Sequence, residues 1–185
     1  AAPILIELAG NGHFGSIAAL GRTGDRRAIP TLTELAANPR LGLEAVMALS
    51  NIDANRAVPL LVRMLEDIEP NAMEPRHRYA LQKLAAIDAE RATPVLVKLL
   101  GKVDPSQVTV SYDRVSEPLS TLAEVASQLK AKEALPQLLE YAQYPEVIEA
   151  LADIGDPTAL PVLQNIVDDG GEIVRKNGFF VDFSG

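Results

Sequence analysis

A short signature of the form Ala-x-Pro-x-Leu recurs along this chain at intervals of a few tens of residues. The copies share an Ala two residues before a Pro and a Leu two residues after it: Ala1–Leu5, Ala28–Leu32, Ala57–Leu61, Ala92–Leu96, Ala134–Leu138 and Ala159–Leu163. A further apolar residue follows three positions after each Leu, which places the two side chains on one helical face. Pro is tolerated in the first turn of a helix, because its missing N–H has no intrahelical acceptor there. The signature therefore predicts that every copy opens a helix.

A second apolar position stands at a constant distance before each later Pro. Its five occupants lie ten residues before the signature Pro: Leu20, Leu49, Leu84, Ala126 and Leu151. A Gly-Asp or Asp-Ala pair follows four of them and is typical of one helix ending and the next being capped. The unit is thus a helical hairpin, which buries its apolar face only against neighbouring copies. We expect an all-α fold, a right-handed α-solenoid of about five to six hairpins over residues 1–170, followed by a tail or β-hairpin over residues 171–185.

Composition limits the chemistry of this chain. Aromatic residues make up 4% of it and Cys is absent, which excludes disulfides, thiolate nucleophiles and Cys-ligated metals. The net charge of −8 argues against a partner held through phosphates, so we expect no nucleic acid. No uncharged apolar run approaches the ~20 residues of a membrane helix, so we expect no membrane insertion.

The stretch Glu149–Leu163 resembles the HEAT-like repeats named for phycobilisome lyases, and the resemblance extends over nearly the whole chain. It implies the helical repeat architecture and leaves the activity open, because such repeats serve enzymes and adaptors alike. Deoxyhypusine hydroxylase, a related type of protein, holds iron through His-Glu pairs. Here Phe14 follows His13 and Arg78 follows His77, so that site is missing. The sequence indicates no catalytic residue, no cofactor and no metal site, although a bilin-lyase type of enzyme remains an alternative.

Two insertions interrupt the repeats, at Asp67–Arg78 and at Gly101–Pro118. Both are expected on the same edge, where loops of a scaffold often contact a partner; tolerated surface loops are the competing interpretation. The partner-binding candidates in these insertions are Met73, Arg76, His77, Arg78, Tyr112 and Arg114. Alternating apolar and polar residues over Gln107–Tyr112 also predict a short extended segment.

Three other parts of the sequence offer candidate contacts for a ligand or partner. The second helices are expected to line a concave face with these polar positions: Glu44, Asn51, Lys83, Glu124, Gln128, Glu149 and Asp153. Arg22, Arg26 and Arg27 cluster near the first inter-repeat turn, where they either bind an anion or are simply solvated. The C-terminal Asn-Gly pair predicts a β-hairpin whose exposed edge offers apolar contacts to a partner, with a second helix as the alternative. Those contacts are Phe179, Val181 and Phe183.

Taken together, these features predict a non-catalytic protein–protein interaction scaffold, binding through the insertions or the concave face. The alternatives are an accessory enzyme and one segment of a larger structural array.

Overall fold

The computed structural model describes residues 2–111, 114–115 and 118–168. Within these ranges the fold is all-α, with eleven α-helices, short 3-10 turns and one pair of two-residue strands. The chain divides into two compact units. Unit 1 comprises Ala1–Ile68 and Glu74–Ala92, and unit 2 comprises Glu69–Met73 and Thr93–Gly185. The predicted all-α class and helical repeats are confirmed.

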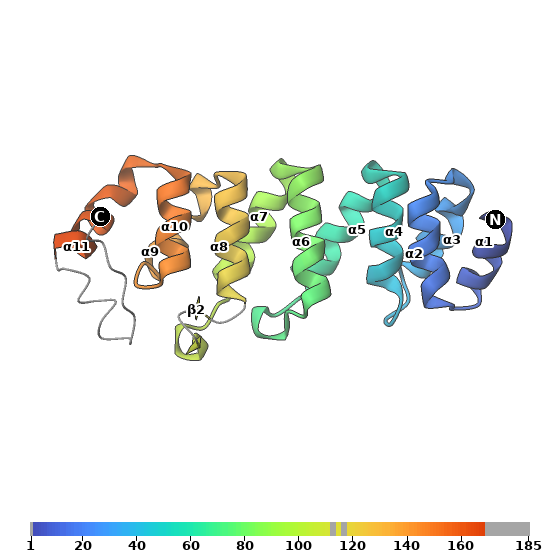
Figure 1. Ribbon diagram of the computed structural model, residues 1–185, viewed down its shortest axis with the longest axis horizontal. Helices are drawn as coiled ribbons and strands as arrows, with labels where there is room; N and C mark the ends of the chain where they lie inside the picture. Colours follow the sequence, from blue (N-terminus) through green and yellow to red (C-terminus); the bar gives the residue numbers. More distant parts are fainter. Residues whose placement is uncertain (1, 112–113, 116–117, 169–185) are drawn as a thin grey trace. The chain divides into compact units, whose positions relative to one another are not determined.

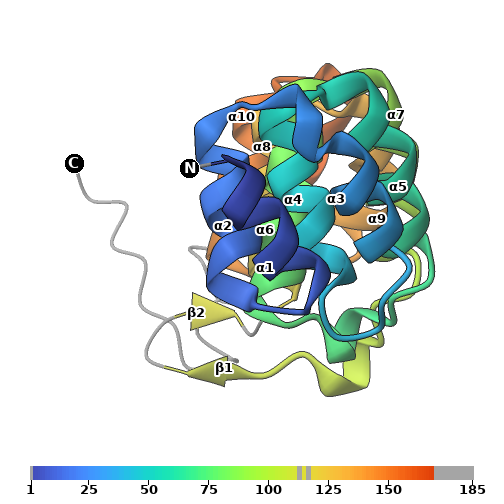
Figure 2. The same ribbon diagram turned by 90° about the vertical axis from the view of Figure 1, so that its right-hand side faces the viewer.

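Unit 1 consists of three hairpins in two layers. The helices that carry the signature are α1 (Ala2–Gly10), α3 (Ile29–Leu35) and α5 (Ala54–Glu66). The second helices are α2 (Phe14–Thr23), α4 (Gly42–Ile52) and α6 (Pro75–Ile87). Within this unit α2, α4 and α6 lie side by side in one layer, and α3 and α5 lie in the other (Figures 1 and 2). Leu20, Leu49 and Leu84, at the position ten residues before each Pro, are fully buried.

Unit 2 repeats this arrangement. The division between the units falls within α7 (Ala89–Leu100), which carries the fourth signature. The other helices of unit 2 are α8 (Leu119–Leu129), α9 (Leu135–Leu139), α10 (Pro145–Ile154) and α11 (Leu160–Asp168). The second helices α8 and α10 pack side by side (Figure 1). Their core positions Ala126 and Leu151 are buried like the equivalent residues of unit 1.

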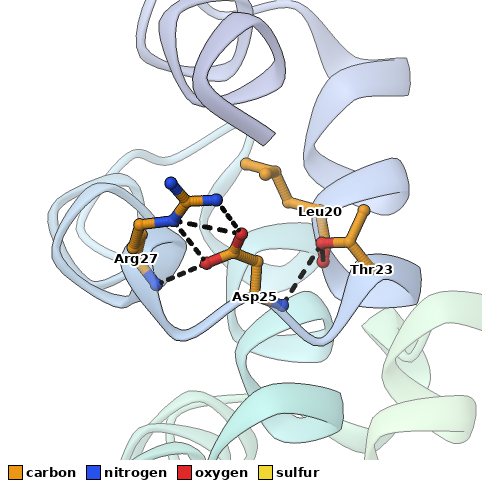
Figure 3. Close-up of polar contacts among 4 residues, drawn as sticks. All are labelled: Leu20, Thr23, Asp25 and Arg27. Atoms are coloured by element: carbon orange, nitrogen blue, oxygen red, sulfur yellow. Dashed lines mark hydrogen bonds and ion pairs between the residues drawn. The ribbon is translucent and has the colours of Figure 1, made fainter. Parts of the chain in front are cut away.

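The turns between hairpins are of two kinds. After α2, Gly24 has a φ of 65°, and the Asp25 carboxylate accepts the backbone N–H of Arg27 at 3.0 Å. The result is a 3-10 turn, Arg26–Ala28, before the signature helix (Figure 3). After α10, Gly155 at a φ of 68° leads in the same way into the 3-10 turn Pro157–Ala159. A left-handed residue is required here, and Gly adopts that conformation without a steric penalty.

The other kind of turn lacks a left-handed residue and corrects the sequence-based expectation. Asp53 follows α4 directly and accepts the backbone N–H of Arg56 at 3.3 Å, so it caps an α-helix that begins at Ala54. Pro59 therefore lies inside α5, and Pro94 lies inside α7 for the same reason. The prediction that every signature opens a helix is wrong for these two copies.

The two insertions meet within unit 2. Lys102 Nζ lies 2.9 Å from Glu69 Oε1, which joins the start of the first insertion to the start of the second. The Tyr141 hydroxyl donates to the backbone carbonyl of Val103 at 2.8 Å. The predicted extended segment is present as β1 (Val110–Ser111), and its partner is β2 (Arg114–Val115) in antiparallel register. Both strands belong to the same insertion. A search for a pairing strand elsewhere in the sequence therefore had nothing to find.

The expectation for the C-terminus lies outside what the structure describes. Residues 169–185 include the predicted C-terminal β-hairpin with Phe179, Val181 and Phe183, and the hairpin is not among the described residues. None of the described helices is long and apolar enough to cross a membrane.

Candidate partner-binding groove

A groove of about 300 Å³ runs over the layer of second helices in unit 1. We call it the Arg groove and define it by the side chains that line it: Phe14, Ala18 and Arg22 from α2; Leu43, Glu44, Met47, Ala48 and Asn51 from α4; Arg76 and Tyr79 from α6; and Arg40 from the loop before α4. Lining residues three or four apart on one helix share a face, which explains how each helix contributes several of them. A neighbouring hollow shares Phe14, Arg40 and Arg76 and extends toward the loops at Gly12 and Asn38.

Large apolar side chains are exposed in the Arg groove. Phe14 is 56% exposed and Tyr79 is 59% exposed, while Leu43 and Met47 are half-buried. Packing against the core does not account for the exposure of the two aromatic side chains, because α2 and α6 bury Leu20, Leu81 and Leu84 completely. Exposed aromatic side chains beside Arg are typical of the centre of protein interfaces.

The guanidinium groups of Arg22 and Arg40 are both exposed in this groove. Among the described residues, neither forms an ion pair. Arg76 differs, because its Nε lies 2.7 Å from Glu74 Oε2. Glu44 is the sole acidic residue that lines the groove. The groove is therefore locally basic in a chain whose net charge is −8.

The predicted cluster of three Arg near the first turn is divided by the structure. Arg27 binds the Asp25 carboxylate through two guanidinium nitrogens, with a closest distance of 2.6 Å (Figure 3). Arg26 lies 3.2 Å from Asp53. The side-chain hydrogen bonds from Arg27, together with its backbone N–H, lower the pKa of Asp25 to about 2. These two Arg stabilise turns, and Arg22 alone faces the groove.

The partner-binding residues predicted in the insertions are divided between the two units. Arg76 joins the Arg groove, whereas Met73 belongs to unit 2. Arg76, His77 and Arg78 stand in the first turn of α6 instead of a loop. Tyr112 lies outside the described residues, and Arg114 contributes its backbone to β2.

His77 has a clear structural role. Its Nδ1 accepts the backbone N–H of Glu74 at 3.1 Å, which completes a capping box at the start of α6. Burial, and then the neighbouring Arg76 cation, lower the pKa of His77. The neutral ring that accepts this hydrogen bond is thereby favoured.

Two of the polar positions predicted on the second helices lie in the Arg groove. Glu44 and Asn51 line the Arg groove, and Lys83 Nζ donates to Asn51 Oδ1 at 2.8 Å. Sequence reasoning missed Phe14, Met47 and Tyr79 as groove residues. Two of these residues could have been found from the sequence. Phe14 and Met47 lie sixteen and twelve residues before their signature Pro, and these offsets fall on the same helix face as the predicted polar positions.

A second groove, of about 250 Å³, lies over α8 and α10 in unit 2. We call it the acidic groove, and its charged lining residues are Glu124, Glu146, Glu149 and Asp153. No Lys or Arg is among the described residues that line it. Glu146 accepts the Val115 backbone N–H through Oε1 at 3.1 Å, and its Oε2 is buried without a described partner. The predicted polar positions Glu124, Glu149 and Asp153 line this groove and are exposed to solvent. Gln128 is exposed as well, but it is not among the residues that line the groove.

In the part of the chain that the structure describes, no three His, Asp or Glu residues are grouped so that they could hold a metal ion.

Comparison with known families agrees with the repeat architecture. A model of HEAT repeats matches residues 14–73, which include the Arg groove from α2 to α4, and a model of the PBS lyase HEAT-like repeat matches residues 146–169, which form α10 and α11. The chain is a HEAT-like repeat protein. No curated protein and no solved structure matches this HEAT-like protein. The families therefore establish a helical repeat architecture and do not specify a ligand.

Proposed function

We propose that this HEAT-like protein is a non-catalytic interaction scaffold that binds a protein partner at the Arg groove of unit 1. The observation that carries the proposal is the combination of exposed Phe14 and Tyr79 with Arg22 and Arg40 in one groove. Aromatic residues and Arg contribute a large share of binding energy in protein interfaces.

The groove is the centre of the proposed interface and not its whole extent. A stable protein interface buries about 800 Å² on each partner, more than this hollow offers. The proposal keeps the other predicted positions as further partner contacts: Met73, His77, Arg78, Tyr112 and Arg114, with Phe179, Val181 and Phe183.

Affinity capture with the full chain tests the proposal. Phe14→Ala with Tyr79→Ala removes the two exposed aromatic side chains and should abolish capture of a partner that the wild type retains. Leu160→Ala with Val167→Ala is the matched control, because these residues are 61% and 57% exposed on α11. Circular dichroism checks that both variants are folded. A partner captured equally by the wild type and the groove variant would place the interface elsewhere and contradict the proposal.

A bilin-lyase type of accessory enzyme is the second candidate, and the match of residues 146–169 to the PBS lyase HEAT-like repeat favours it. Incubation of the pure chain with a bilin and an apoprotein acceptor distinguishes the two. Faster covalent attachment of the chromophore than without the chain would favour the enzyme, and an unchanged rate would favour the scaffold.

A further inference from the structure

We infer that the Arg groove takes a short, extended acidic peptide segment, with carboxylates on Arg22 and Arg40 and an apolar side chain against Phe14 and Tyr79. This inference rests on the proposed function and specifies the chemistry of the partner at the same site.

The charges of the groove favour an acidic partner. The groove presents three Arg against one Glu, and among the described residues the guanidinium groups of Arg22 and Arg40 have no acidic partner. A guanidinium group binds a carboxylate in a planar, two-pronged geometry, which suits Asp or Glu side chains of a peptide. The other cations near the first turn, Arg26 and Arg27, are already paired with Asp side chains. The groove thus brings together two cations, Arg22 and Arg40, that have no acidic partner among the described residues.

The apolar lining carries the second step. Phe14 comes from α2 and Tyr79 comes from α6. The repeat between them supplies α4, whose Leu43 and Met47 are half-buried in the same groove. An apolar side chain of the peptide would cover surface that is now exposed to water. Met adapts its shape to different apolar side chains, so the groove does not require one particular residue type.

The length of the segment follows from helix packing. Neighbouring helices pack about 8–10 Å apart, so a path from α2 across α4 to α6 is about 20 Å long. An extended peptide advances about 3.3 Å per residue, and about six residues span that path. A segment of this size needs only two or three charges to occupy the groove.

A nucleic acid fits the same observations less well. Its affinity grows with the number of phosphates neutralised, and the groove offers three cations. Longer polyanions would also meet the acidic remainder of the chain, whereas charges more than about 8 Å away are screened from a short peptide at physiological salt.

Selection from a display library of random peptides, about eight residues long, tests the inference on the full wild-type chain. We expect enrichment of sequences in which Asp or Glu flank an apolar residue. The enriched peptide is then labelled, and its affinity is measured by fluorescence anisotropy. Arg22→Gln with Arg40→Gln should weaken binding about tenfold and reduce its salt dependence. Arg63→Gln with Lys98→Gln removes the same charge from exposed positions on α5 and α7 and should change affinity less than about twofold.

The outcomes separate the inference from the proposed function. Loss of binding in Phe14→Ala with Tyr79→Ala, but not in the double Arg variant, would overturn the acidic partner and keep the groove as an interface. Binding that is insensitive to both pairs would overturn both. Enrichment of neutral or basic peptides, or no enrichment at all, would overturn the inference. So would displacement of the peptide by a single-stranded oligonucleotide of about eight nucleotides at equal concentration.

Discussion

The Arg groove of unit 1 and the acidic groove of unit 2 are lined from the same repeat positions. At sixteen residues before the signature Pro, the Arg groove has Phe14 and Leu43, and the acidic groove has Ser120. Twelve residues before the Pro, Met47 of unit 1 corresponds to Glu124 and Glu149 of unit 2. The same repeat positions thus line both grooves and carry different chemistry. The repeat determines where a groove forms, and the residues at three or four positions per hairpin decide what it attracts.

The two units also differ in how closely their second helices approach. Gly21 stands nine residues before Pro30, and Ser127 stands nine residues before Pro136. A Cβ on Gly21 would lie 2.8 Å from Ala48 Cα, which is a backbone atom that cannot rotate away. In unit 2, the Ser127 hydroxyl fits and donates to Asp153 Oδ2 at 2.6 Å.

Exchange of these two residues gives the largest expected effect. Gly21→Ser introduces the residue of unit 2 into unit 1 and should destabilise the fold by about 2 kcal/mol, because α2 and α4 must separate. Ser127→Gly loses an exposed hydrogen bond and some helix propensity, and should cost about 1 kcal/mol or less. Urea unfolding monitored by circular dichroism measures both. Equal losses in the two variants would show that α2 and α4 pack no more tightly than α8 and α10.

Charge neutralisation compares the two grooves directly. Arg22→Gln with Arg40→Gln should lower the affinity for the selected acidic peptide about tenfold, because both side chains contact it in the proposed complex. Glu149→Gln in the acidic groove should change that affinity less than about twofold, because the peptide does not occupy unit 2. Anisotropy titrations at one salt concentration measure both. A comparable change from Glu149→Gln would show that the two grooves do not act separately on this peptide.

The insertions give the next largest effect. Tyr141 is 2% exposed, and its hydroxyl ties Val103 of the second insertion to unit 2. Burial raises the pKa of this hydroxyl, so it remains a donor at neutral pH. Tyr141→Phe should destabilise the chain by about 1 kcal/mol, since the Val103 carbonyl loses its buried donor. Tyr79→Phe, at an exposed position in unit 1, is the control and should have little effect. An equally small effect of both would mean that the buried hydrogen bond does not stabilise the insertion.

Much of this architecture was predictable because the constant ten-residue offset keeps Leu20, Leu49 and Leu84 in the core. Glu44 and Asn51, which were predicted as polar positions of the second helices, both line the Arg groove. The helix starts at Ala54 and Ala89 were not predicted, because they depend on the backbone conformation at the end of the preceding helix. Where Asp follows a left-handed residue, a 3-10 turn comes first. Where Asp itself ends the helix, the next α-helix begins at once. Arg22 could not be separated from Arg26 and Arg27 either. Their different roles arise from the positions of Asp25 and Asp53 in space, which the spacing of charges along the chain does not give.

The smallest expected effect compares the turns that precede the signature helices in each unit. The pKa of Asp25 is lowered to about 2 chiefly by the Arg27 side chain, and that of Asp156 to about 2 chiefly by the Thr158 backbone N–H. Each carboxylate therefore stabilises the fold above its ordinary pKa of 3.8, and this contribution is lost as the pH falls toward 2. Asp25→Asn and Asp156→Asn should each flatten the decline of stability between these pH values.

Salt distinguishes the two turns, because an exposed ion pair is screened more than a backbone hydrogen bond. Raising NaCl from about 20 mM to about 500 mM should move the pKa of Asp25 back toward its ordinary value more than that of Asp156. The Lys132 Nζ to Asp156 Oδ2 contact at 3.2 Å is also screened, so the pKa of Asp156 should respond to salt as well, but less than that of Asp25. Carboxyl ¹³C chemical shifts followed through an acid titration report both groups separately. Equal shifts would show that the ion pair with Arg27 is not the main cause of the low pKa of Asp25.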